Sequence, residues 1–379
     1  MKTKKIINAL AVSYLIFASI SNAFACTALV VTDKSGKAYY GRTMEMPYTM
    51  PVPSLLTYIP ASTAVESNTP NGGKGMSFGT KYAILGMTVA VLPNAKLPLL
   101  VEGINDQGLS FSANAMMPSS AAPVGSDPSK ILSANEFGMW VLGTHNSLAS
   151  LKADLLSQNV QVWLPKIAFL GNVEAPLHYA IFDKVGNGLV IEFTQNKMNV
   201  YDNPVGVMTN APEFPWHLTN LNNYTQDNVN KNSGQLGKLK LETVDAGIAL
   251  SALPSSQTGT GRFVKAAFYA NYVQKGKTPD EAVNLLAHIM NNFDRPNDLT
   301  IDAPGSSGDG GKSKTASSEV TQWTVMGDLT RNQFYVKSIN AMNWSMIDMN
   351  KLKGVNKIKS ISTYDVDKAG ANSFNLFMQ

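Results

Sequence analysis

Residues 26–45, CTALVVTDKSGKAYYGRTME, predict a β-hairpin. Residues 28–32 and 38–44 are rich in β-branched and aromatic side chains, and Asp33-Lys34-Ser35-Gly36 between them is typical of a turn. A hairpin folds its second strand back beside its first. Arg42 and Glu45 are therefore expected close to Cys26, the first residue of the hairpin.

The 25 residues before Cys26 have the three parts of a secretory signal. Lysines at positions 2, 4 and 5 precede an apolar centre over residues 6–20, and Ala23-Phe24-Ala25 is a small-x-small cleavage site. The apolar centre is shorter than the roughly 20 residues of a membrane span. We expect cleavage after Ala25, which makes residues 26–379 a single mature domain in the periplasm or outside the cell, with no transmembrane helix.

Two other fates of this N-terminus stay open. The leader could be retained as an anchor, or Cys26 could be lipidated, which would make the chain a lipid-anchored ligand-binding protein. Lipidation normally requires an aliphatic residue where Ala23 stands and a small residue where the bulky Phe24 stands. It would also acylate the α-amine of Cys26, so it excludes any chemistry that uses this amine.

Composition argues against a nucleic-acid-binding protein and for a globular protein with a reactive thiol. The chain has 31 basic and 27 acidic residues, and removal of the leader with its three lysines leaves 28 basic residues, a net charge of +1. This is no basic footprint for nucleic acid. A hydrophobic content of 44% with 15% charged residues is typical of a globular protein. The single cysteine cannot form an internal disulfide, and a lone thiol kept in an oxidising compartment indicates reactivity.

The remaining pattern predicts an α+β domain with antiparallel sheets covered by helices. Residues 47–80 and 305–318 are expected as irregular loops, and no internal repeat or linker interrupts the chain. Helices are expected at 133–142, 150–157, 261–274 and 278–292. Strands are expected at 82–87, 97–101, 109–113, 178–183, 188–193, 205–209, 322–326, 333–338 and 346–348.

Once the leader is removed, Cys26 would supply both a nucleophile and its general base. Its thiol and a free α-amine then belong to one residue, and an amine of pKa about 7.7 can accept the proton of a thiol of pKa about 8.5. The positive charge of Arg42 would favour the thiolate, and Glu45 could hold the α-ammonium group. Asparagine amides or backbone N–H groups would be needed to stabilise the oxyanion.

Motifs along the whole mature chain resemble the choloylglycine hydrolase family, which includes conjugated bile acid hydrolases and penicillin V acylases. The longest match is NPVGVMTNAP at 203–212, continued by LTNLNNY at 218–224. The other matching motifs are Cys26-Thr27, Gly41-Arg42-Thr43-Met44-Glu45, Asn105-Asp106-Gln107-Gly108-Leu109, Gly261-Arg262-Phe263 and Thr321-Gln322-Trp323-Thr324.

This resemblance implies the four-layer αββα sandwich of the N-terminal nucleophile hydrolases. It implies an amidohydrolase that acts on a small N-acyl amide, needs no metal or organic cofactor, and assembles as a homotetramer. By the same resemblance Cys26 is the nucleophile and its α-amine the base. Arg42 lies near the thiol, Asn210 donates to the oxyanion, and Arg262 completes the charged cluster.

Some positions depart from the family pattern. Glu45 stands where Gram-positive bile salt hydrolases carry aspartate, and Ala211 where they carry a second asparagine. The other oxyanion donor falls at Asn114 or Ala115; we expect Asn114, with a neighbouring backbone N–H as the alternative. These departures and the leader resemble the Gram-negative branch. Penicillin V or an N-acyl homoserine lactone is therefore the predicted substrate, and a conjugated bile acid is the alternative.

Taken singly, the same residues have plainer interpretations. Arg42 would be a surface ion-pair residue, Asn210 a strand cap, and Arg262 a first-turn helix residue. The methionines and aromatic residues at 44–58 and 214–216 fit an acyl pocket and an ordinary core equally well. The four histidines, at 145, 178, 217 and 288, show no metal-ligand spacing and are expected to be structural or exposed. For the histidine at 217, a position lining the cleft is the alternative.

Overall fold

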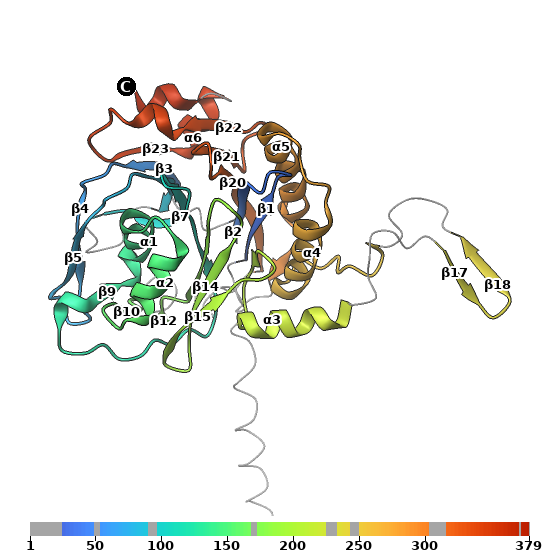
Figure 1. The fold of residues 1–379 in the computed structure, drawn as a ribbon, viewed down its shortest axis with the longest axis horizontal. Helices are drawn as coiled ribbons and strands as arrows, with labels where there is room; N and C mark the ends of the chain where they lie inside the picture. Colours follow the sequence, from blue (N-terminus) through green and yellow to red (C-terminus); the bar gives the residue numbers. More distant parts are fainter. Residues whose placement is uncertain are drawn as a thin grey trace, which may run out of the picture.

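A computed structural model describes residues 25–48, 54–89, 97–167, 173–224, 233–242, 250–302, 316–370 and 373–378. It contains two large antiparallel β-sheets with helices on their outer faces (Figure 1). This is the four-layer αββα arrangement that the motifs imply. None of the helices in these residues is both long and apolar enough to span a membrane.

The first sheet contains the hairpin of residues 26–45 and carries α4 (Gly259–Tyr272) and α5 (Pro279–Met290) on its outer face. Its strand order is β16 (Val207–Met208), β1 (Cys26–Thr32), β2 (Ala38–Pro47), β20 (Ser317–Asp328), β21 (Gln333–Ser338) and β22 (Ser345–Asp348), with β19 (Ile301–Asp302) paired to β20.

The second sheet is covered by α1 (Ala134–Thr144) and α2 (Leu148–Leu156). Its strand order is β15 (Lys197–Asp202), β14 (Gly188–Thr194), β13 (Leu177–Phe182), β8 (Ser110–Ala115), β7 (Leu99–Asn105), β6 (Ile84–Val89), β3 (Ser54–Ile59) and β23 (Lys359–Ser362).

Smaller elements lie around these layers. The short strand pairs are β4 (Ala64–Asn68) with β5 (Lys74–Gly79), β9 (Ile131–Ser133) with β10 (Gln161–Trp163), β11 (Lys166–Ile167) with β12 (Val173–Glu174), and β17 (Ser233–Leu236) with β18 (Leu239–Glu242). The other helices are α3 (Phe214–Asn220) and α6 (Thr363–Ala369), with 3-10 turns at Pro128–Lys130, Leu221–Tyr224, Asn291–Phe293, Met349–Leu352 and Ser373–Phe377.

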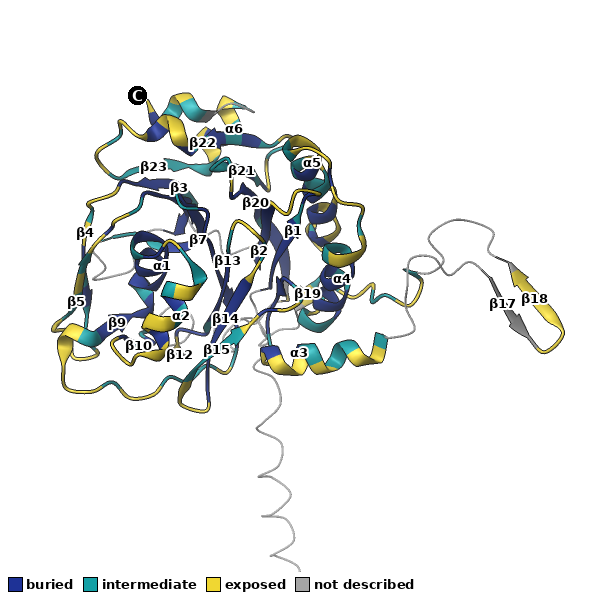
Figure 2. Ribbon diagram, in the orientation of Figure 1, coloured by how far each residue is buried: buried dark blue, intermediate teal, exposed yellow. Residues whose placement is uncertain are grey.

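Alternation along the strands of the second sheet divides the core into two parts. Ala180 and Phe182 of β13 face the first sheet, whereas Tyr179 and Ile181 face α1 and pack near Phe137. Each fully buried aromatic or aliphatic side chain stabilises the fold by about 1.5–3 kcal/mol. The strands of both sheets are accordingly buried along most of their length, while exposed residues lie on the rim (Figure 2).

The hairpin and the helix starts agree with the sequence prediction. Strands β1 and β2 pair in the register that places Ala28 opposite Arg42, and Gly36 takes the positive φ of +79° that a turn glycine adopts readily. Ser133 caps α1 by accepting a hydrogen bond from the N–H of Asn135.

Other predictions were wrong in part. Residues 54–79, expected as loop, form β3, β4 and β5. The apolar strand β3 pairs within the second sheet, and the polar residues that follow it form the more exposed hairpin of β4 and β5. The strand expected at 205–209 is only two residues long, and β15, β23, α3 and α6 were not predicted. Most of the loop expected at 305–318 lies outside the described residues.

Candidate active site

Cys26 begins β1 and lies directly opposite Met44 of β2. Because side chains alternate along a strand, Arg42 and Met44 project from the same face of β2. The sulfur of Cys26 is 3.2 Å from Nη2 of Arg42 and 3.8 Å from Sδ of Met44. The strand pairing therefore brings an arginine to the only thiol of the chain, at a position that is 1% exposed.

Arg42 is fully buried, and the second sheet supplies most of its partners. Its Nη1 is 2.9 Å from Oε2 of Glu102, and its Nη2 donates to the carbonyl of Ala113 at 2.7 Å. Burial opposes the charge of Arg42, but the negative groups around it, Glu102 foremost, together outweigh burial and raise the pKa of Arg42 above its ordinary value. Arg42 is therefore a permanent cation beside the thiol.

The thiol itself is kept in its neutral form. Burial raises the pKa of Cys26, and the positive charge of Arg42 opposes this effect. The backbone of Ala115, which lines the same pocket as Cys26, has a smaller lowering effect on the pKa of the thiol. A backbone donor at this position can receive negative charge that develops next to the sulfur.

Asn210 and Arg262 hold the backbone of Cys26. Oδ1 of Asn210 accepts from the backbone nitrogen of Cys26 at 2.9 Å and from Nη2 of Arg262 at 2.6 Å. Nη1 of Arg262 donates to the carbonyl of Cys26 and, at 2.7 Å, to the hydroxyl of Thr27. Arg262 lies in the first turn of α4, where burial, with a smaller effect of nearby Arg295, lowers its pKa to about 10.

Glu45 follows a β-bulge after Met44 and is fully buried near Arg262. The hydroxyl of Thr321 donates to its Oε1 at 3.2 Å. Burial raises the pKa of Glu45, against the lowering effect of Arg295 and Arg262. Glu45 is thus a buried carboxyl group near the arginines that surround the nucleophile.

The buried charges around the thiol balance. Arg42 pairs with Glu102, Arg295 pairs with Glu319, and Glu45 lies under the influence of Arg262. Three arginines and three glutamates sum to zero charge. This balance matters because an uncompensated charge at such depth is strongly unfavourable. The six residues are Arg42, Arg262, Arg295, Glu45, Glu102 and Glu319, all at most 5% exposed.

Asn114 lies in the same cluster, but its amide bonds to Thr209 and Ser112 and not to Cys26. Its Nδ2 donates to the carbonyl of Thr209 at 2.8 Å, and its Oδ1 accepts from the hydroxyl of Ser112 at 3.0 Å. The neighbours Ala113 and Ala115 line the pocket that Cys26 faces. The side chain of Asn114 therefore links β8 to the Thr209 segment, and the backbone of Ala115 is the group that β8 presents to the sulfur.

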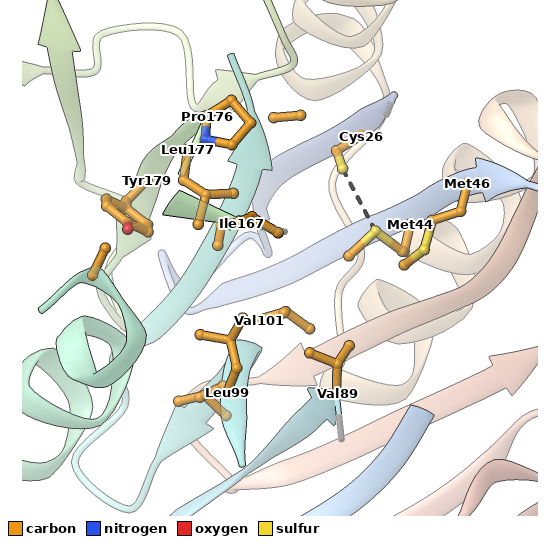
Figure 3. A pocket seen from close by; sticks show the side chains of 14 residues that line it. Cys26, Met44, Met46, Val89, Leu99, Val101, Ile167, Pro176, Leu177 and Tyr179 are labelled. Atoms are coloured by element: carbon orange, nitrogen blue, oxygen red, sulfur yellow. Dashed lines mark hydrogen bonds between the residues drawn. The ribbon is translucent and has the colours of Figure 1, made fainter. Parts of the chain in front are cut away.

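The pocket next to the thiol is almost entirely apolar. Met44 and Met46 line one side, and the rest is lined by aliphatic side chains of β6, β7 and β8, by Leu177 and Tyr179 of β13, and by Ala134, Ile167 and Pro176. Figure 3 shows Cys26 pointing toward Met44, with Leu177 and Val101 among the side chains that surround the space in front of them. Such a pocket can hold an apolar acyl group with its carbonyl carbon at the sulfur.

The sequence analysis missed several polar residues of this site, above all Glu102 and the Arg295–Glu319 pair. Glu102 stands alone as an acid within the apolar run Leu99–Ile104, and a single carboxylate in a buried strand indicates an internal cationic partner. Ala115 was named beforehand only through the family resemblance, as the alternative to Asn114, because a residue that acts through its backbone has no residue-type signal in the sequence. In the described part of the chain no cluster of His, Cys, Asp and Glu could hold a metal ion.

Sequence comparison places the chain among known amide hydrolases. A sequence model of the linear amide C–N hydrolases of the choloylglycine hydrolase family matches residues 26–361, beginning at Cys26. The chain is 29% identical over 347 residues to a bile salt hydrolase/transferase of Clostridium perfringens, covering 90% of this chain and 97% of that protein. It is 28% identical to a bile salt hydrolase/transferase of Lactiplantibacillus plantarum, covering 72% and 80%.

Solved structures share the fold. A variant of conjugated bile acid hydrolase from Clostridium perfringens superposes with a TM-score of 0.72 at 27% identity, covering 89% of this chain and 97% of that one. Penicillin V acylase from Agrobacterium tumefaciens superposes with a TM-score of 0.69 at 20% identity, covering 89% and 91%. At that identity the second likeness concerns the fold alone.

Proposed function

The chain belongs to the choloylglycine hydrolase family of linear amide C–N hydrolases, and from this we propose that it cleaves conjugated bile acids through a thioester on Cys26. One observation carries the proposal. The sulfur of Cys26 accepts from Arg42, its backbone nitrogen donates to Asn210, and the residue lines an apolar pocket. Nucleophile, charge and acyl site thus meet at one residue.

We further propose that the chain is exported and cleaved after Ala25. The nitrogen of Cys26 then becomes an α-amine, and Oδ1 of Asn210, 2.9 Å away, can accept one of its hydrogens. This contact would orient the lone pair of the amine toward its own thiol. An amine in this position can act as the general base for the sulfur, directly or through one water molecule.

The reaction then proceeds in two halves. The amine takes the thiol proton, and the sulfur attacks the carbonyl carbon of the amide. We assign the N–H of Ala115 and the Nδ2 group of Asn210 as the donors to the oxyanion; Nδ2 also donates to the carbonyl of Ala115 at 2.8 Å. Cleavage of the C–N bond transfers the proton from the α-ammonium to the leaving amine. Water then hydrolyses the thioester and restores the thiol.

Conjugated bile acids are the preferred substrate class for two reasons. The pocket offers apolar walls without a charged group, which suits a rigid steroid acyl group. The relatives from Clostridium perfringens and Lactiplantibacillus plantarum, which match 90% and 72% of the chain, are both named bile salt hydrolase/transferase. These relatives support the bile acid alternative over penicillin V and N-acyl homoserine lactones, which the departures at Glu45 and Ala211 had favoured.

A substrate panel tests this proposal. We expect the exported protein to release glycine or taurine from conjugated bile acids with a higher kcat/KM than it shows for penicillin V or a long-chain N-acyl homoserine lactone. The released amine or acid is quantified by liquid chromatography, and the intact mass shows whether the chain begins at an unmodified Cys26. Faster cleavage of penicillin V would reverse the substrate order, and a lipidated Cys26 would contradict the mechanism.

The role of the α-amine has its own test, because Cys26 is the only thiol. In a chain that keeps Ala25 before Cys26, we expect the pH midpoint of iodoacetamide alkylation to lie above that of free cysteine, since burial raises the pKa of the thiol. In the chain that begins at Cys26, the midpoint should be lower, because the α-ammonium favours the thiolate. Equal midpoints in the two folded chains would show that the amine does not interact with the thiol.

A further inference from the structure

Asn210 must be placed accurately, yet the sheet gives it little support. Its side chain contacts the nitrogen of Cys26, the guanidinium of Arg262 and the carbonyl of Ala115. It lies two residues beyond the end of β16, a strand whose ladder with β1 includes only Val207 and Met208. Other contacts must therefore hold the Thr209–Asn210 backbone against the nucleophile.

His217 of α3 supplies one of these contacts. Its Nε2 is 2.8 Å from the carbonyl oxygen of Asn210, and its ring is stacked on Phe263 with centroids 4.4 Å apart. Burial lowers the pKa of His217 to about 4, so the ring is neutral at physiological pH. Because Nε2 faces a carbonyl oxygen, the single proton of the neutral ring must be on Nε2. His217 is thus a fixed donor to the backbone of Asn210.

His178 of β13 holds the preceding carbonyl from the other side. Its Nε2 is 3.1 Å from the carbonyl oxygen of Thr209, and its Nδ1 is 3.1 Å from Oε1 of Glu192 on β14. Glu192 also accepts from the N–H of Phe214, the first residue of α3, at 3.0 and 3.1 Å. The same carboxylate therefore supports His178 and anchors the helix that carries His217.

The two contacts of His178 fix where protons must lie. Nε2 faces the carbonyl oxygen of Thr209, which can only accept, so Nε2 carries a proton. A second proton lies between Nδ1 and Oε1 of Glu192 and links the two side chains. Both residues are at most 1% exposed, so water offers no substitute partner.

We propose that His217 and the His178–Glu192 pair are positioning residues that clamp the peptide carbonyls of Thr209 and Asn210. The clamp keeps the side chain of Asn210 on the α-amine of Cys26. This inference rests on the proposed function, since it assigns these residues a part in the same reaction. The two histidines act through Asn210, so their loss should lower kcat and leave binding in the apolar acyl pocket largely unchanged.

Substitution of His217 tests the clamp. His217→Phe keeps a ring that can stack on Phe263 but removes the donor to Asn210, whereas His217→Gln retains an amide donor. We expect His217→Phe to lower kcat by about 10- to 100-fold, because small displacements of catalytic groups have effects of this size, with KM changed by less than about twofold. His217→Gln should recover most of the lost kcat.

His145→Phe is the matched control. His145 is also buried, with Nε2 3.1 Å from a carboxylate oxygen of Asp154 and Nδ1 3.2 Å from the carbonyl oxygen of Val141, but it lies at the end of α1. Its substitution should lower the urea midpoint without changing kcat per folded molecule. If His217→Phe behaves like His145→Phe, with kcat retained, the clamp is disproved.

Nitrogen-15 NMR of the histidine rings tests the donor role of His178, and the chain has only four histidines to assign. At pH 7 we expect Nε2 of His178 to carry a proton, because it faces the carbonyl oxygen of Thr209. An Nε2 without a proton in the wild-type protein would overturn that role. Wild-type turnover is measured first: its absence contradicts the proposed function, whereas unchanged kcat in an otherwise active His217→Phe enzyme contradicts only the clamp.

Discussion

Replacement of Cys26 by alanine is expected to abolish amide hydrolysis, with a loss in kcat of about 10⁶-fold, the size seen when a hydrolase loses its covalent nucleophile. The described residues place no second thiol or activated hydroxyl against Arg42 in the pocket. Without the sulfur, no thioester can form. The loss is measured as glycine or taurine released from a conjugated bile acid by the purified, correctly processed variant.

The same variant should remain folded. Nη2 of Arg42 keeps its hydrogen bond to the carbonyl of Ala113 at 2.7 Å, and its Nη1 keeps Glu102, so removal of the sulfur leaves no charge unpaired. We expect the free energy of unfolding to change by about 1 kcal/mol, measured by urea denaturation. Cys26→Ser is the control, because it keeps a weaker nucleophile of similar size. Retained turnover in folded Cys26→Ala would rule out the thioester mechanism.

Substitution of Glu102 by glutamine is expected to have the largest effect on stability, a loss of about 3–5 kcal/mol in the free energy of unfolding at pH 7. Glutamine has nearly the same shape and can still accept from the indole N–H of Trp323. It cannot neutralise Arg42, which is fully buried 2.9 Å from the lost carboxylate oxygen. The cost is therefore that of one uncompensated buried charge.

The same substitution should change the thiol in a defined direction. With the negative charge of Glu102 removed, less negative charge offsets Arg42, while burial and Glu45 still act on the thiol as before, so the pKa of the thiol should fall. At a fixed pH below that pKa, iodoacetamide should then alkylate the folded variant faster than the wild-type protein. A slower reaction would mean that Arg42 has turned away from the sulfur.

Glu66→Gln is the matched control for Glu102→Gln. Glu66 also pairs with a cation at 2.9 Å, but its partner Lys74 is 81% exposed. Water can replace the lost partner, so we expect a change below about 1 kcal/mol in urea denaturation and no change in alkylation. Equal stability losses in the two variants would show that burial of the Arg42–Glu102 pair is not what makes it important.

The amino-acid sequence by itself determined the features that depend on neighbouring residues. The alternation of residues 28–32 and 38–44 and the turn at Asp33–Gly36 specify the pairing of β1 with β2, and this pairing brings Arg42 to Cys26. The caps at Ser133 and Thr278 specify where α1 and α5 begin. These features follow from local periodicity and capping, which operate within a few residues.

The motifs of the chain also identified Asn210 and Arg262, although they are 184 and 236 residues from Cys26. That identification came from resemblance to a family and not from local patterning. The match to a bile salt hydrolase/transferase over 90% of the chain agrees with that family resemblance. The substrate order expected from the departures at Glu45 and Ala211 has less support from the relatives than the bile acid alternative. Two substitutions in a site say little about the shape of its pocket.

Only the tertiary structure decided which buried polar groups meet. Glu102 is 60 positions from Arg42 in the sequence, and the two pair because opposite sheets present them to each other. On β8, Ala113 and Ala115 line the pocket, whereas the side chain of Asn114 between them donates to the carbonyl of Thr209. Alternation predicts that neighbouring side chains face opposite ways, but the packing of the two sheets determines which face meets the nucleophile.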